Sequence, residues 1–174
     1  MSNFIKNQLL NCVKQVASHV QDYVYNPSKD FTRSRKLSFD QVLLSLLEMG
    51  GQTLSRELLQ LDLPISNSAF VQSRYKVKPE AFQALFHSFT KEVHPSTDYP
   101  ILAVDGSDLN IPVNPDDFDS YFPSSTGGRA YNLLHLNALY DLTHGLYLDA
   151  RIQPRKQMDE RRALIDMMEN SPFR

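Results

Sequence analysis

Apolar residues in the first half of the chain recur every three to four positions, which is the period of an amphipathic helix. The stripe from Phe4 to Val24 predicts a first helix, which Asn26-Pro27-Ser28 ends. Short helices with capping or breaking residues at their borders are expected further on. These helices are expected to begin after Ser38, after Thr53, after Ser66 or Ser68, and at Pro79. The helix after Ser38 is expected to end at Gly50-Gly51. This pattern predicts a compact helical bundle with helix-turn-helix-like pairs.

Beyond residues 94–97 the hydrophobic period changes to two, which indicates strands. Ile101–Val104 predicts a short buried strand, which Asp105-Gly106-Ser107-Asp108 ends, and a long polar loop from Pro112 to Arg129 follows. Two alternating stretches joined by Asp141–Gly145 predict an antiparallel hairpin. In the second stretch Leu146, Leu148, Ala150 and Ile152 share the apolar side. A last helix is expected over Gln157–Glu169, with Ala163, Leu164, Met167 and Met168 facing inward. The fold class is therefore α+β, with a helical region at 1–97 and a strand-rich region at 98–174.

The composition of the 174 residues, with 41% hydrophobic and 22% charged positions, is that of a globular protein. The apolar runs are too short to span a bilayer, and the first residues lack the features of a signal peptide. A single cysteine, Cys12, excludes an internal disulfide framework and a Cys-rich zinc site. These features predict a reduced, cytoplasmic protein without a membrane partner.

The net charge of −2 divides unevenly along the chain. Residues 1–97 carry 11 basic and 8 acidic side chains (+3), whereas residues 98–174 carry 7 and 12 (−5). The basic residues of the first half form two clusters, Arg33/Arg35/Lys36 and Arg74/Lys76/Lys78. Positive side chains near a helix C-terminus also suit the helix dipole, so a purely structural role is the alternative. Two such clusters on a small helical bundle are what contacts to DNA phosphates require.

Among the acidic residues Asp105 is the most informative, because it follows an apolar strand and precedes a glycine. An aspartate in this position either caps a turn or offers a carboxylate to a hard divalent cation. Turn chemistry is favoured for Asp108, Asp141 opens the hairpin turn, and Asp149 is expected to face away from the apolar side of its strand. The histidines show no metal-ligand spacing and are interpreted as structural or surface residues: His19, His87, His94, His135 and His144.

Several of these segments together resemble DDE transposases of the insertion-sequence-four group. The segments ILAVDGSDLNIP, YNLLHLNALYDLTHGLYLDARIQP and QMDERRALIDMM are similar to the first part of the catalytic domain of that family. RKLSFDQVLLSLLEMGGQTLSRELLQL and ISNSAFVQSRYKVKPEAFQALF resemble the helical region before it. The resemblance covers nearly the whole chain from about Phe31 and rests on the order and spacing of these segments.

The resemblance implies a helical DNA-binding bundle followed by the first three antiparallel strands and the first helix of an RNase H-like domain. In such enzymes two aspartates and a glutamate hold two magnesium ions, which activate the attacking oxygen and stabilise the leaving one. Asp105 corresponds to the first aspartate and metal ligand. The two later carboxylates would follow the last helix, so the chain is interpreted as an N-terminal fragment with an incomplete catalytic site.

The leading hypothesis is a transposase that binds double-stranded DNA at transposon ends in the bacterial cytoplasm, associated with the nucleoid. The alternative is a non-catalytic DNA-binding fragment that inhibits transposition, and a third is an α+β protein unrelated to transposases. The strand Ile101–Val104 is expected to remain an unpaired edge, which predicts marginal stability and self-association, as a homodimer or an aggregate.

Overall fold

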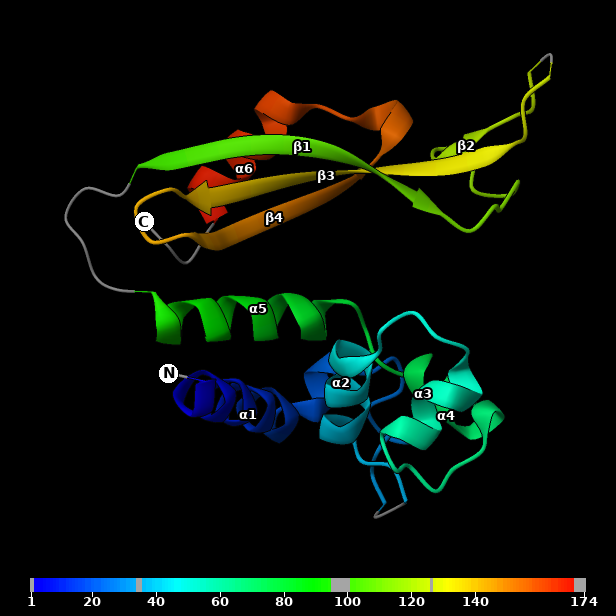
Figure 1. The fold of residues 1–174 in the computed structure, drawn as a ribbon, viewed down its shortest axis with the longest axis vertical. Helices are drawn as coiled ribbons and strands as arrows, with labels where there is room; N and C mark the ends of the chain where they lie inside the picture. Colours follow the sequence, from blue (N-terminus) through cyan, green and yellow to red (C-terminus); the bar gives the residue numbers. More distant parts are fainter. Residues whose placement is uncertain (1, 34–35, 95–100, 126, 171–174) are drawn as a thin grey trace. The chain divides into compact units, whose positions relative to one another are not determined.

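The computed structural model describes residues 2–33, 36–94, 101–125 and 127–170. It divides into two compact units, Met1–Val93 and His94–Arg174 (Figure 1). In the described residues the first unit contains helices and the second an antiparallel sheet with helical segments, which confirms the α+β class. No helix in the described ranges is long and apolar enough to cross a membrane.

The first unit is built from five α-helices and one 3₁₀ turn in its described part, packed around a single apolar core. Phe70, Val42 and Leu43 are completely buried in this core, and Val13 and Leu85 nearly so. The elements are α1 (Ser2–Ser18), η1 (Val20–Tyr23), α2 (Phe39–Glu48), α3 (Leu54–Gln60), α4 (Asn67–Arg74) and α5 (Glu80–Val93).

Local capping signals define both borders of α2 and the start of α4, as the sequence predicts, whereas the side chain of Thr53 before α3 makes no capping hydrogen bond. The side chain of Gln41 accepts a hydrogen bond from the backbone N–H of Ser38 at 2.9 Å and fixes the start of α2. Gly51, after the end of α2, has a φ of +82°, a conformation that glycine adopts without steric cost. The hydroxyl of Ser66 accepts from the N–H of Ala69 and caps α4.

The first helix is shorter than the predicted stripe from Phe4 to Val24. α1 ends at Ser18, whose hydroxyl donates to the carbonyl of Gln15 and competes with the helical hydrogen-bond ladder. Val24 instead forms an antiparallel bridge with Val77, which ties the segment after η1 to the segment before α5. At the other end Phe4 is 57% exposed, so the buried stripe begins only further along the helix.

The second unit is an antiparallel sheet with β3 at its centre (Figure 1). β1 pairs with β3 along one side, and β2 and β4 pair with β3 along the other. Within the described residues the outer edge of β1 pairs with no strand. The elements are β1 (Leu102–Ile111), β2 (Tyr121–Phe122), β3 (Tyr131–Asp141), β4 (Leu146–Pro154), η2 (Arg155–Gln157) and α6 (Glu160–Asn170).

The first strand does not end at Asp105, so that prediction is wrong. β1 continues to Ile111, because its backbone pairs in unbroken register with β3, from Leu102 opposite Asp141 to Ile111 opposite Asn132. Asp105 and Asp108 are therefore strand residues in the middle of β1. Since side chains alternate along a strand, these two carboxylates leave β1 on opposite faces.

The predicted hairpin is present, but its faces differ from the prediction. A register shift lies between Leu139 and Tyr140, so Leu139 opposes Asp149 while Tyr140 opposes Tyr147. The extra residue of this β-bulge is Leu148. Leu148 and Asp149 are consequently both buried, whereas Ile152 is 61% exposed. The predictions that Asp149 points away from the core and that Ile152 belongs to it are both wrong.

One face of the sheet packs against α6 (Figure 1). The apolar core there is small and consists of Leu139, Leu148 and Met167. Ala163, four residues before Met167 on α6, is also buried. The helix begins at Glu160 rather than Gln157, because η2 precedes it and Asp159 accepts from the N–H of Arg162. Of the predicted inward residues, Met168 is 62% exposed, since it follows Met167 by one position.

Candidate nucleic-acid interface and acidic sites

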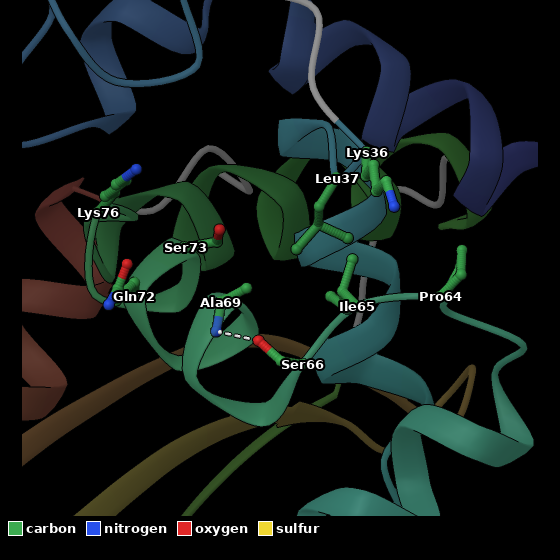
Figure 2. A pocket seen from close by; sticks show the side chains of 9 residues that line it. All are labelled: Lys36, Leu37, Pro64, Ile65, Ser66, Ala69, Gln72, Ser73 and Lys76. Carbon is green, nitrogen blue, oxygen red and sulfur yellow. Dashed lines mark hydrogen bonds between the residues drawn. The ribbon is translucent and has the colours of Figure 1, made fainter.

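A pocket of about 520 Å³ opens in the helical unit between α4 and the segments before α2 and before α4 (Figure 2). Lys36 and Lys76 lie at opposite sides of it, and no carboxylate is found among the lining residues that the structure describes. The residues between the two lysines include both apolar and polar side chains. The pocket is lined by Lys36, Leu37, Pro64, Ile65, Ser66, Ala69, Gln72, Ser73 and Lys76.

This pocket brings together one residue from each of the two basic clusters of the sequence. Lys36 precedes α2 and Lys76 follows α4, forty residues later in the chain. The hydroxyl of Ser66 caps α4 at this pocket, so the first backbone N–H groups of that helix, which carry partial positive charge, lie beside it. Two ammonium groups and a helix N-terminus make the pocket a local centre of positive potential.

The other predicted DNA-binding residues do not line this pocket. Arg33 is exposed and lines a smaller pocket beside Phe31 and Phe39, and Arg35 lies outside the described residues. Arg74 is exposed, with its guanidinium 5.3 Å from the centre of the Tyr75 ring. The ammonium group of Lys78 donates to the backbone carbonyl of Asp22 at 3.1 Å, so its charge is partly used within the bundle.

Asp105 is exposed on the edge strand β1, on the face opposite to Asp108. Its carboxylate accepts a hydrogen bond from the N–H of Gly106 at 2.9 Å. Among the described residues it forms no ion pair. The carboxylate therefore keeps oxygen lone pairs that a cation could use.

Asp108 belongs to an ion-pair network rather than to a turn, which corrects the interpretation from sequence. Its two oxygens accept hydrogen bonds from Nδ1 of His135 at 2.6 Å and from Nε of Arg155 at 2.9 Å. Nε2 of His135 lies 3.2 Å from a carboxylate oxygen of Glu160 at the start of α6. The hydrogen bond from His135 holds the pKa of Asp108 below its usual value; burial opposes this effect and Arg155 reinforces it. The network joins β1, β3 and α6.

A second group, which the sequence did not indicate, could hold a metal ion. His94, Asp141 and His144 place one ligand atom each within 4.8 Å of one another. Burial alone would raise the pKa of the Asp141 carboxyl. Hydrogen bonds from His144, His94 and the backbone N–H groups of Thr143 and His144 outweigh burial and lower that pKa well below the usual range. The only sequence signal was the Asp-Leu-Thr-His spacing of the hairpin turn.

Comparison with known proteins identifies no relative: no family model, no curated protein and no solved structure matches this chain. The resemblance to transposases therefore stays a prediction from the sequence segments.

Proposed function

We propose that the helical unit binds double-stranded DNA, with Lys36 and Lys76 contacting phosphates on either side of the pocket. The observation that carries the proposal is that one lysine from each basic cluster lines the same pocket, beside the capped N-terminus of α4. Neutralising phosphates releases condensed counterions, which drives binding without any base contact. Backbone N–H groups at a helix N-terminus are a recurrent site for a phosphate oxygen.

The lining favours a sugar–phosphate backbone over a small inorganic anion. Between the lysines lie Leu37, Ile65 and Ala69, which offer apolar surface to a deoxyribose. Gln72 and Ser73 follow on α4 and supply hydrogen-bonding groups to phosphate oxygens or base edges. Arg74 and Tyr75, both exposed, extend the same end of α4 with a cation and an aromatic ring.

A DNA titration tests the proposal. Fluorescence anisotropy with a labelled duplex is measured over a series of salt concentrations for the wild type and for Lys36→Gln/Lys76→Gln. Each phosphate contact contributes about 0.9 to the slope of log K against log salt, so the double variant should flatten the slope by about 2.

The matched control is Lys6→Gln/Lys14→Gln, which removes the same charge from exposed positions of α1. This control should keep the wild-type slope. Equal slopes for the wild type and the pocket variant, or equal losses in both double variants, would refute the pocket as the DNA-binding surface.

The proposed DNA-binding unit belongs to a DDE-type transposase, with Asp105 as the first metal-binding carboxylate. Three features support this assignment. Three long antiparallel strands are followed by α6, Asp105 is exposed on the first of these strands, and it has no ion-pair partner in the described residues. Magnesium bound with the help of Asp105 would activate the attacking oxygen and stabilise the leaving oxygen of a phosphodiester.

Asp108 does not help Asp105 to hold such an ion, because it leaves the opposite face and is engaged by His135 and Arg155. One carboxylate binds magnesium weakly without substrate phosphates. Residues 1–174 should therefore bind transposon-end DNA without nicking it, and cleavage that requires magnesium would contradict this expectation. The gene sequence after codon 174 tests the class directly. In-frame codons for a further aspartate and for a Tyr, Arg, Glu, Lys motif would support a transposase.

A further inference from the structure

The end of the β3–β4 hairpin forms a second polar centre, which includes neither Asp105 nor any residue that lines the pocket of the helical unit. Asp141 is the last residue of β3, and its side chain is completely buried. Its Oδ2 atom lies 2.8 Å from Nε2 of His94 and 2.6 Å from Nδ1 of His144. The two imidazole rings meet edge to face, with their centres 5.2 Å apart.

The carboxylate of Asp141 is held in one orientation by the turn. Its Oδ1 atom accepts hydrogen bonds from the backbone N–H groups of Thr143, at 2.7 Å, and His144, at 3.3 Å. A backbone hydrogen bond also fixes this turn to the residue before β1, because the N–H of Leu142 donates to the carbonyl of Ile101 at 2.8 Å. Oδ1 is thereby occupied, and Oδ2 is directed at both imidazoles. Outer hydrogen bonds of this kind orient the ligands of metal centres.

From this geometry we propose that His94, Asp141 and His144 form a binding site for a zinc-type divalent transition metal. Two imidazole nitrogens and one carboxylate oxygen are ligands typical of zinc and are unlike the all-oxygen sets that magnesium and calcium prefer. A set of three protein ligands leaves the fourth tetrahedral position to water. The site is independent of the proposed DNA contacts and of Asp105.

Accepting such an ion requires side-chain shifts of about an ångström. Ligand atoms at about 2.0–2.1 Å from a tetrahedral metal lie about 3.3 Å apart, so Oδ2 would recede from the two nitrogens by about 0.5–0.7 Å. The two nitrogens, which lie within 4.8 Å of each other, would approach by up to about 1.5 Å. The side chains of His94 and His144 are 15% and 17% exposed, which gives the ion a path from solvent to a carboxylate that is itself buried. On binding, each imidazole turns a lone pair, instead of an N–H, toward the centre and releases a proton if it carries one there.

Calorimetric titration of tag-free, chelator-treated protein with zinc chloride tests the proposal. The wild type should bind one zinc ion per chain, and cobalt should bind with the visible absorption bands of a tetrahedral complex. His94→Gln and His144→Gln keep an amide N–H that can donate to Asp141 but lose the imidazole ligand. Each should weaken zinc binding by more than about tenfold, since even outer-shell partners of metal ligands are worth about 10–100-fold.

His19→Gln is the matched control, because His19 is an exposed histidine at the end of α1, outside this group. It should bind zinc as the wild type does. Circular dichroism confirms that each variant is folded. No stoichiometric zinc binding by the wild type would overturn the proposal and leave the group a hydrogen-bonded His–Asp–His cluster. Wild-type zinc affinity in both His94→Gln and His144→Gln would overturn it as well.

Discussion

Gly106 lies close to the imidazole ring of His135, and replacing this glycine by alanine should destabilise the sheet unit. A Cβ atom at position 106 would lie 2.4 Å from Nε2 and 3.0 Å from Cε1 of His135. Ordinary contacts begin at 3.4 Å, so the ring would have to recede by at least 1.0 Å. His135 is buried and bonded to Asp108, so it has little room for this movement.

The expected magnitude follows from two opposing effects. Overpacking a buried site costs about 1–3 kcal/mol. Replacing glycine by alanine in a strand, where the backbone tolerates it, stabilises by about 0.4–1 kcal/mol through the unfolded chain. Gly106→Ala should therefore lower the free energy of unfolding by about 1–2 kcal/mol. In a His135→Ala background the nearest remaining neighbour of the new Cβ atom is Oε1 of Glu160 at 3.2 Å, at the end of a side chain that is 56% exposed. This flexible side chain can give way, so the same substitution should become neutral or slightly stabilising there.

Urea denaturation, followed by far-UV circular dichroism and by hydrogen exchange of the β3 amides, measures both effects. With an m value of about 1–2 kcal/mol/M, the midpoint for the sheet unit should fall by about 1 M in the wild-type background. The four proteins of this double-mutant cycle then give the coupling between the two positions. An equal effect of Gly106→Ala in both backgrounds would refute the steric argument, as would stabilisation in the wild type.

Three further predictions concern stability and association. Phe70→Ala should lower the free energy of unfolding of the helical unit by about 3–5 kcal/mol, since Phe70 is completely buried; a loss below 1 kcal/mol in urea denaturation would contradict this. The hydrogen bonds that lower the pKa of Asp141 stabilise the sheet unit at pH values above 3.8, the ordinary pKa of this carboxyl group. The free energy of unfolding should therefore fall as the pH drops below 3.8. Asp141→Asn should flatten this acid dependence in denaturation curves recorded between pH 2 and 6, and an unchanged curve would speak against it. Leu102→Lys, on the edge strand, should reduce self-association measured by sedimentation velocity, whereas an unchanged sedimentation distribution would exclude β1 as the associating edge.

Local signals made the helical unit predictable. The capping pair of Ser38 and Gln41, the left-handed Gly51 and the cap at Ser66 each act within a few residues of the border that they define. Their effect does not depend on what packs against the helix, so the sequence indicates them directly. The hairpin was predictable for the same reason, because its alternating pattern and the glycine of its turn, Gly145, are also local signals.

The predictions failed where the answer depended on pairing between distant segments. The bulge at Leu148 is not marked by glycine or proline, and it placed Asp149 in the interior. Asp108 meets His135 only because the β1–β3 register brings together residues that are 27 positions apart. Packing of the helical unit likewise decided that Lys36 and Lys76, but not Arg33 or Arg74, share a pocket. No local pattern carries this information.

The pairing of β1 with β3 also has a consequence for the order of events during folding. Leu102 finds its partner in Asp141, thirty-nine residues later, whereas β3 and β4 are joined by a tight turn. Because closing a long loop costs entropy before any contact forms, the β3–β4 hairpin should form first and β1 should join last. During synthesis the helical unit emerges and can fold while β1 is still without its partner. Folding of the sheet unit then proceeds from the later strands back to the earlier one, against the direction in which the chain is made.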